Sequence, residues 1–331
     1  MKNTLGKLFL LAFCILFACC GSGDSDDEGQ KPDNGGGGTS QTLETAYLPI
    51  ADPYVLLHDG TYYAYGTGDL PDGSQGIACF SSKDLTNWKR ASVALRASDS
   101  YADRWFWAPE VYHINGKFYM FYSADEHICV ATSDSPEGPF RQSEQKPIWN
   151  EKSIDTNLFI DDDGTPYLYF VRFTDGNVIW VAEMEKDLMS IKTETLRQCI
   201  KAEEPWETVQ AKVAEGPSVL KKDGKYYMLY SANDYQSQLY GVGYATSDSP
   251  MGPWKKYGGN PILQKVASAG LVGTGHGAPF QTVDGKWKYI FHAHWSKESV
   301  QPRTSYFLDF NIDDDGVATI GGKLIKPRVL K

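Results

Sequence analysis

The stretch that decides the fold is Asn115-Gly116 followed by Lys117-Phe118-Tyr119-Met120-Phe121-Tyr122, a turn and then an aromatic strand. Asn-Gly and Asp-Gly are the preferred pairs of two-residue β-hairpins, because type I′ turns require positive φ at both central residues. The pattern occurs five times, with turns at Asp59-Gly60, Asn115-Gly116, Asp163-Gly164, Asp223-Gly224 and Asp284-Gly285. The glycines are 56, 48, 60 and 61 residues apart, so we expect each copy to centre on a hairpin.

A third strand is predicted after each hairpin, at Ile77 to Ser81, Ile128 to Thr132, Ile179 to Ala182, Gly241 to Thr246 and Ser305 to Phe310. A fourth, outer strand is predicted after proline-containing loops, two of which, 133–140 and 247–254, are nearly identical. Four short antiparallel strands in each unit are typical of propeller blades. The prediction is an all-β fold, a five-bladed β-propeller. A β-sandwich with coincidental hairpins is the alternative, and the near-identity of the two loops argues against it.

The N-terminus has the pattern of a secreted lipoprotein. Lys2 and Lys7 precede an apolar run that ends at Ala18-Cys19, which resembles a bacterial lipoprotein signal. The predicted domains are a signal peptide at 1–18, a flexible acidic and glycine-rich linker at 19–45, and a propeller at 46–331. Cys19 is the expected lipidation site, with the protein anchored to the outer membrane at its periplasmic face or on the cell surface. An ordinary signal peptide with a chance cysteine is the alternative.

Charge limits the class of partner. The formal net charge is -10, whereas binding a nucleic acid requires a basic surface. We therefore expect no nucleic-acid partner and a neutral or weakly acidic substrate. Separately, we expect the protein to be a monomer.

The residues that begin the five repeats carry the candidate chemistry. The first strand of each blade lines the central channel of a propeller, and the residues eight or nine positions before the turn glycines are Asp52, Ala108, Asp155, Glu215 and His276. All five should converge at one end of the channel. Carboxylates that lie close together raise each other's pKa, which allows an acid and a base to coexist at one pH. This arrangement predicts a catalytic centre.

From about Tyr47 onward, the chain resembles glycoside hydrolase family 43, the inverting arabinan- and xylan-cleaving five-bladed propellers. The resemblance rests on one short motif in each blade, namely Ala51-Asp52-Pro53-Tyr54-Val55, Trp107-Ala108-Pro109-Glu110-Val111, Ile154-Asp155-Thr156, Ala214-Glu215-Gly216-Pro217 and Gly273-Thr274-Gly275-His276-Gly277. It implies that Asp52 is the general base and Glu215 the general acid. Asp155 would orient the acid and keep its pKa high.

Three further site residues are predicted, two of them, His276 and Arg303, from the resemblance. His276 matches a histidine that faces a metal ion in the channel, usually calcium held largely through water. Calcium prefers oxygen ligands, so a single histidine is weak evidence for such a site. A structural or substrate-facing role for His276 stays open. Arg303 lies where family members often carry an arginine that reaches a substrate hydroxyl. Trp107 is expected, from its place in the ring, to stack on a sugar, and a core position for Trp107 is the alternative.

The predicted function is an inverting glycosidase that removes terminal pentosides from plant polysaccharides, an α-L-arabinofuranosidase or a β-xylosidase. Endo-arabinanase and exo-galactanase activities remain alternatives. Retaining relatives are disfavoured, because they carry Arg-Asp-Pro where this chain has Ile154-Asp155-Thr156. A surface glycan-binding propeller without activity is the second class, and a protein-interaction propeller is the third.

Overall fold

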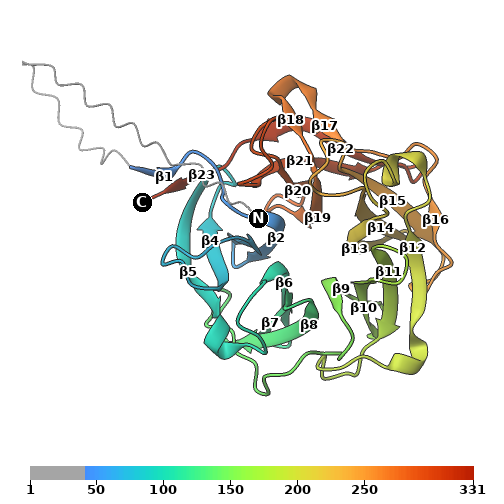
Figure 1. Ribbon diagram of the computed structural model, residues 1–331, viewed down its shortest axis with the longest axis horizontal. Coiled ribbons are helices and arrows are strands. Elements are labelled where there is room, and N and C mark those ends of the chain that lie inside the picture. The colour runs from blue at the N-terminus through green and yellow to red at the C-terminus, as the bar shows by residue number, and fades with distance from the viewer. Residues whose placement is uncertain (1–41) are drawn as a thin grey trace, which may run out of the picture. The chain divides into compact units, whose positions relative to one another are not determined.

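The computed structural model describes residues 42–331, and within them five antiparallel sheets are arranged around a central axis (Figure 1). The predicted signal peptide, Cys19 and most of the predicted linker lie outside the described residues. Residues 43–45, predicted as linker, instead form a strand of the domain. No helix in the described part is long and apolar enough to cross a bilayer.

The first and second blades come from residues 51–133. Blade one contains β2 (Ala51–His58), β3 (Thr61–Thr67), β4 (Gly76–Ser82) and β5 (Asn87–Arg96). Blade two contains β6 (Trp107–Ile114), β7 (Lys117–Ala124) and β8 (His127–Ser133), and its fourth strand is reduced to one bridge between Thr132 and Arg141.

The remaining three blades follow in chain order. Blade three contains β9 (Ser153–Ile160), β10 (Pro166–Arg172), β11 (Val178–Glu183) and β12 (Arg197–Lys201). Blade four contains β13 (Ala214–Lys222), β14 (Lys225–Ala232), β15 (Gly241–Ser247) and the short β16 (Lys255–Lys256). Blade five contains β19 (Gly275–Gln281), β20 (Trp287–Ala293), β21 (Thr304–Ile312) and β22 (Ala318–Ile325), and a small hairpin of β17 (Lys265–Val266) and β18 (Leu271–Val272) precedes it.

Both ends of the domain close the ring on blade one. The C-terminal β23 (Arg328–Leu330) pairs in parallel with β5, and β1 (Leu43–Thr45) pairs with the outer edge of β23. The outermost edge of the first blade is therefore covered by strands from the two ends of the domain (Figure 1).

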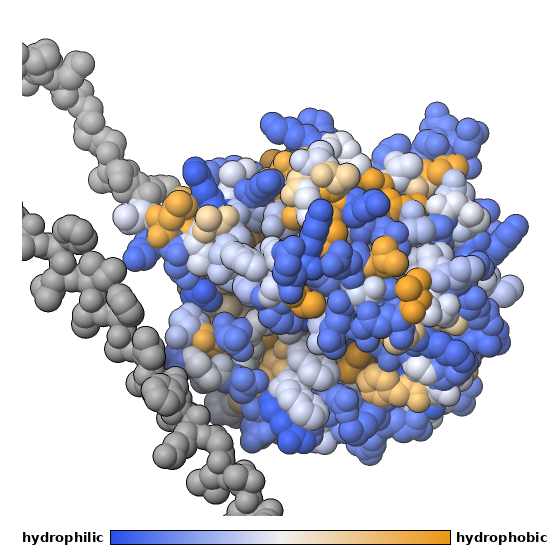
Figure 2. Space-filling model, turned by 45° about the horizontal axis from the view of Figure 1, so that its top comes forward, coloured by the Kyte–Doolittle hydropathy of each residue, from blue (hydrophilic) through white to orange (hydrophobic). Residues whose placement is uncertain are grey.

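The core is divided into five apolar clusters, one between each pair of neighbouring blades. Between blades five and one, for example, the rings of Trp88 and Phe307 stack with centroids 6.0 Å apart. Burial of such large side chains is the main source of stability in a fold of short strands. On the face drawn in Figure 2, the apolar side chains that reach the surface form small separate patches among hydrophilic ones.

The hairpin prediction is confirmed, but the five turns are of two kinds. The turns at 59–60, 115–116 and 223–224 have positive φ at both residues, as a type I′ turn requires. At Asp163-Gly164 and Asp284-Gly285 only the glycine has positive φ, and the loop is one residue longer. This geometry matches a type I turn followed by a left-handed glycine, so the dipeptide alone did not determine the turn type.

Every inner strand carries an irregularity near its first residues. The register shifts close to Asp52, Ala108, Asp155, Gly216 and His276, and all five residues have positive φ. Such a bulge leaves a backbone N–H outside the strand ladder and redirects the side chain. The chain thus bends five times at one end of the channel, which we call the mouth.

Candidate active site

The bulge amides are satisfied by the preceding blade. Thr67, Ser123, Ser231 and His292 occupy equivalent positions, each seven residues after its turn glycine. Their side chains accept the backbone N–H of Ala108, Asp155, His276 and Asp52, respectively, over 2.7–3.1 Å. Ser, Thr and His at this position therefore fix the inner strand of the next blade.

Blade three differs from the other four blades at this position, and the difference places a carboxylate in the site. Its residue at this position is Val171, which has no polar group to offer to blade four. The N–H of Gly216 instead donates to Asp155 Oδ2 over 3.2 Å. The Asp155 carboxylate is thereby held against the inner strand of blade four, beside Glu215.

The structure corrects the predicted alignment of Glu215 by one residue. Gly216, not Glu215, is the left-handed bulge residue that corresponds to Asp52. Glu215 pairs with Ser231 just as Trp107 pairs with Ser123, so it shares the position of Trp107 and Ile154. The error arose because the hairpin loops of blades three and five are one residue longer, which shifts the count from the glycine.

The predicted carboxylates do come together in one cavity of about 490 Å³ at the mouth. Its lining includes every predicted site residue of the propeller, namely Asp52, Trp107, Asp155, Glu215, His276 and Arg303. Ligand atoms of Asp155, Glu215 and His276 lie within 4.8 Å of one another. Asp52 Oδ1 is 3.3 Å from His276 Nδ1, which lies 3.8 Å from Asp155 Oδ2.

Asp52 is held as an ionised carboxylate. Burial alone would raise its pKa, but the positive charge of Arg303, together with the neighbouring His276 and His292 rings, keeps the pKa well below the usual value. The Arg303 guanidinium donates to both carboxylate oxygens of Asp52, with Nη1 2.8 Å from Oδ1 and Nη2 3.3 Å from Oδ2. A buried ionised carboxylate of this kind can accept a proton from water.

Glu215 has the opposite character. Burial raises its pKa to about 7, although the Tyr240 hydroxyl donates to Oε1 over 2.7 Å and the Asn177 amide donates to Oε2 over 2.8 Å. Burial also raises the pKa of Asp155 well above its usual value, with a further contribution from the nearby charge of Glu215. The pair therefore retains a proton near neutral pH, as a general acid requires.

Three residues of the site were missed from the sequence. Tyr240 holds Glu215, and its ring stacks on His292, which accepts the Asp52 amide. Asn177 holds the other oxygen of Glu215 from the loop after β10. His292 had a signal in the sequence, since it aligns with Thr67, Ser123 and Ser231, whereas Tyr240 and Asn177 lie in loops without a repeating pattern.

Trp107 and Arg303 face the cavity as predicted, each braced by an exposed aromatic residue. The Trp107 ring stacks with Trp105 at a centroid distance of 5.8 Å, and Arg303 lies 4.7 Å over the ring of Tyr235. Trp105 has φ 57°, an unusual backbone conformation for a bulky side chain. Arg303 Nε is buried and has no hydrogen-bond partner among the described residues.

Little space is present around His276 at the predicted calcium site, although Asp155 and Glu215 bring carboxylate oxygens close to its ring. Nδ1 faces Asp52 and Asp155, and the cavity below the ring, lined also by Glu110 and Thr156, has a volume of about 10 Å³. That is roughly the space of one water molecule, whereas calcium takes six to eight oxygen ligands. A calcium ion with its water shell has no room there, and we derive no step through a metal.

The comparisons with known proteins agree with this geometry. The model of glycosyl hydrolases family 43 matches residues 48–318. The chain belongs to this family. As a member of family 43, it is a glycoside hydrolase.

Its relatives act on several sugars. A crystal structure named as an endo-1,4-β-xylanase from Bacteroides thetaiotaomicron is 70% identical, with a TM-score of 0.86, and the match covers 88% of this chain and 100% of that one. A β-D-galactofuranosidase of Aspergillus niger is 29% identical over 78% of each chain. A xylosidase/arabinosidase of Bacteroides ovatus is 28% identical over 83% of this chain and 95% of the relative.

Proposed function

We propose that this hydrolase cleaves pentoside linkages of plant xylans with inversion of the anomeric centre, using Asp52 as base and Glu215 as acid. The observation that carries the proposal is that two carboxyl groups with different partners, a guanidinium at Asp52 and two neutral donors at Glu215, line one cavity. Arg303 favours the ionised form of Asp52, and burial favours the protonated form of Glu215. A glycoside hydrolase requires such a pair of one ionised and one protonated carboxyl group, and inversion is proposed from membership of the family.

In the proposed reaction one water is consumed and one glycosidic bond is broken. Asp52 takes a proton from water while the water oxygen bonds to the anomeric carbon. On the opposite face, Glu215 gives its proton to the leaving glycosidic oxygen as the bond between this oxygen and the anomeric carbon breaks. Asp155, fixed by the Gly216 amide, orients the acid and favours its protonated form.

Sugar binding is assigned to Trp107 and Arg303. The indole of Trp107 offers a flat apolar surface that complements the apolar face of a sugar ring. Arg303 lines the same cavity while its Nη1 donates to Asp52, and its guanidinium is assigned to a substrate hydroxyl. Both residues line the cavity that contains the three carboxylates.

The substrate is proposed from the relatives. Terminal xylose or arabinose is favoured by the Bacteroides ovatus relative, which is named for both sugars. A second candidate, internal cleavage of the β-1,4-xylan backbone, is favoured by the name of the 70% identical structure. A lipid anchor at Cys19 on the outer membrane, proposed from the sequence pattern alone, would place either activity on extracellular or periplasmic glycan.

Product analysis tests the proposal. The wild type is incubated with p-nitrophenyl pentosides, arabinan, xylan and arabinoxylan, beside Glu215→Gln and Asp52→Asn. We expect pentose or xylo-oligosaccharide release by the wild type and a loss of at least about 1,000-fold in both variants, with unchanged circular dichroism. Proton NMR of the first product identifies its anomer. Retention of configuration, or full activity of either variant, would contradict the assignment.

A further inference from the structure

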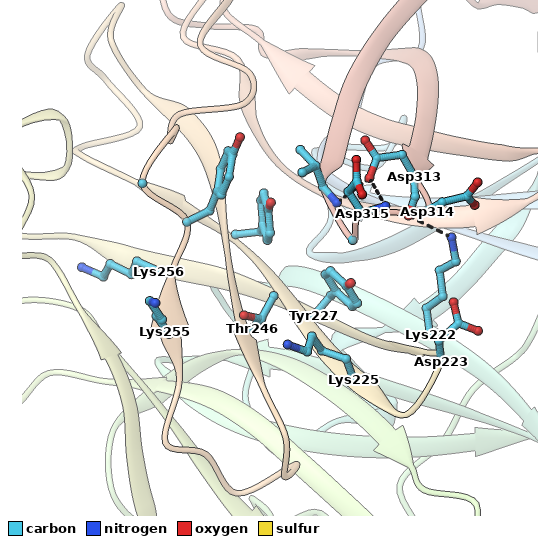
Figure 3. A pocket seen from close by; sticks show the side chains of 15 residues that line it. Lys222, Asp223, Lys225, Tyr227, Thr246, Lys255, Lys256, Asp313, Asp314 and Asp315 are labelled. Carbon is cyan, nitrogen blue, oxygen red and sulfur yellow. Dashed lines mark hydrogen bonds between the residues drawn. The ribbon is translucent and has the colours of Figure 1, made fainter.

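A second hollow of about 540 Å³ lies at the far end of the propeller, between blades four and five. It is far from the mouth, because β13 runs from Glu215 at the mouth to Lys222 at the far end, seven residues or roughly 20 Å away. We call it the far-end cleft. In Figure 3 the turn Asp313–Asp315 forms one side, Lys255 and Lys256 lie on the other, and Tyr227 lies between them.

Three tyrosines give the far-end cleft an aromatic wall. The rings of Tyr244 and Tyr257 stack with centroids 4.7 Å apart, and Tyr227 lies 6.2 Å from Tyr244. The backbone fixes Tyr257, whose N–H donates to Tyr244 O over 3.0 Å and whose carbonyl accepts from the Asn260 N–H over 3.2 Å. The wall is therefore formed before any ligand binds.

The hydroxyl of Tyr227 points to a ligand. The residue is 3% exposed, yet its hydroxyl has no hydrogen-bond partner anywhere in residues 42–331, although it lines the cleft. The Tyr244 hydroxyl accepts the Ala318 N–H over 3.3 Å and keeps its own proton for a further acceptor. Both hydroxyls lie at the wall of the cleft with hydrogen-bonding capacity that no described residue uses, so they can pair with a guest that both donates and accepts hydrogen bonds.

The charge of the lining restricts the class of guest. It contains four lysines and four aspartates, so its formal charge is zero; they are Lys222, Lys225, Lys255, Lys256, Asp223, Asp313, Asp314 and Asp315. Lys222 and Lys256 bind protein oxygens, and Asp313 accepts the amides of its own turn. Phosphate or a polyanion would need a surplus of positive charge, and a cation would need a surplus of carboxylates.

We propose that the far-end cleft is a second, non-catalytic binding site for a neutral sugar chain, namely the polysaccharide that the mouth hydrolyses. Sugars combine an apolar ring face for the tyrosine wall with hydroxyls that pair with phenol, lysine and aspartate groups. The identity of the polysaccharide rests on the proposed function, whereas the class of ligand rests on the cleft. A polymer held there keeps the enzyme at its substrate between cleavage events.

Affinity gel electrophoresis in soluble arabinoxylan tests this site, with Glu215→Gln as the background so that the polymer stays intact. Tyr227→Phe removes only a hydroxyl that no described residue uses, and Tyr257→Ala removes part of the wall. Tyr119→Phe is the matched control, because Tyr119 lies three residues after its turn glycine, as Tyr227 does. We expect at least about a threefold weaker retardation constant for Tyr227→Phe and more for Tyr257→Ala, but no change for the control.

The same three substitutions in the active enzyme separate the two sites. Hydrolysis of a p-nitrophenyl pentoside should be unchanged in all three, while hydrolysis of dilute arabinoxylan falls with Tyr227→Phe and Tyr257→Ala. Retardation equal to that of the background in both cleft variants would overturn the second site and leave the proposed activity intact. Failure of the wild type to hydrolyse any pentosan would instead contradict the proposed function.

Discussion

At the scale of single residues, the site works by giving two carboxyl groups opposite partners. Asp52 receives a guanidinium, and Glu215 receives an amide and a phenol in a buried position. At Asp52 the guanidinium and the neighbouring histidines together outweigh the effect of burial on the pKa, whereas two neutral donors do not outweigh burial at Glu215. The pH profile of kcat/KM should therefore have a basic limb near pH 7, set by Glu215.

Tyr240→Phe should move this basic limb to higher pH. The Tyr240 hydroxyl bond favours the ionised form of Glu215, so its loss lets Glu215 keep its proton longer. The expected displacement is up to about one pH unit, the equivalent of one hydrogen bond. The measurement is kcat/KM between pH 4 and 10 on a p-nitrophenyl pentoside. A limb that stays in place would mean that another group controls it.

Arg303→Gln should change the acidic limb of the pH profile, which depends on the ionisation of Asp52. Without the guanidinium, burial dominates and the pKa of Asp52 rises, so the base becomes protonated at a higher pH than in the wild type. Activity at pH 4 to 5 should then fall much more than activity at pH 7. The ratio of kcat/KM at these two pH values provides the test, and an unchanged ratio would show that Arg303 contributes binding alone.

At the scale of elements, the position seven residues after each turn glycine controls how neighbouring blades are joined. Four blades place Thr67, Ser123, Ser231 or His292 there, and each accepts a bulge amide from the next blade. The Val171 side chain cannot accept a hydrogen bond, so the Gly216 N–H donates to the Asp155 carboxylate instead. An apolar residue at one of five equivalent positions thus makes a carboxylate part of the active site.

Val171→Thr tests this role of the blade-three strand. The new hydroxyl can accept the Gly216 N–H as Thr67 accepts that of Ala108, and Asp155 then loses a bond that favours its ionised form. Asp155 should hold its proton more tightly, so Glu215 should ionise more readily and the basic limb should move to lower pH. We expect kcat to fall about 3- to 30-fold with a similar KM.

Val181→Thr is the matched control for that variant. Val181 is a fully buried valine of the same blade, on β11, and it does not face a bulge amide. Both substitutions should lower the free energy of unfolding by about 1 to 2 kcal/mol. An equal loss of kcat in both variants, without a displaced limb in Val171→Thr, would mean that the effect is one of packing.

At the scale of the whole molecule, the ring is closed by strands from both ends of the domain. β23 places Val329 and Leu330, both buried, against β5, and Lys331 N donates to Thr42 O over 2.9 Å. Besides β23, an isolated bridge between Leu48 and Ser305 joins the segment before β2 to blade five. This closure should contribute to stability more than to catalysis.

Deletion of residues 328–331 should lower the melting temperature by several degrees. Exposure of one valine and one leucine costs about 3 to 6 kcal/mol in free energy of unfolding. Activity at 25 °C should stay within about twofold of the wild type, because the mouth lies on other strands. Deletion of Lys331 alone is the control. A melting temperature like that of the control would show that blades one and five hold together without β23.

The sequence by itself determined the five-bladed propeller and the set of residues that meet at its axis. Both depend on local rules, the Asp-Gly turns and the period-two aromatic strands, which repeat and therefore reinforce one another. The three carboxylates could be found because they recur near equivalent places in three of the repeats. Their protonation states could be expected only in outline, as an acid and a base side by side.

Only the tertiary structure decided which carboxylate receives which partner. Glu215 lies one residue before the bulge, which a count from the turn glycine could not show because the hairpin loops of blades three and five are longer. Tyr240 and Asn177 reach Glu215 from loops without a repeat. The far-end cleft depends on a turn of blade five meeting strands of blade four, some 70 residues apart. Burial and the distances between charges set the pKa values of this site, and both are properties of the packed molecule rather than of any segment.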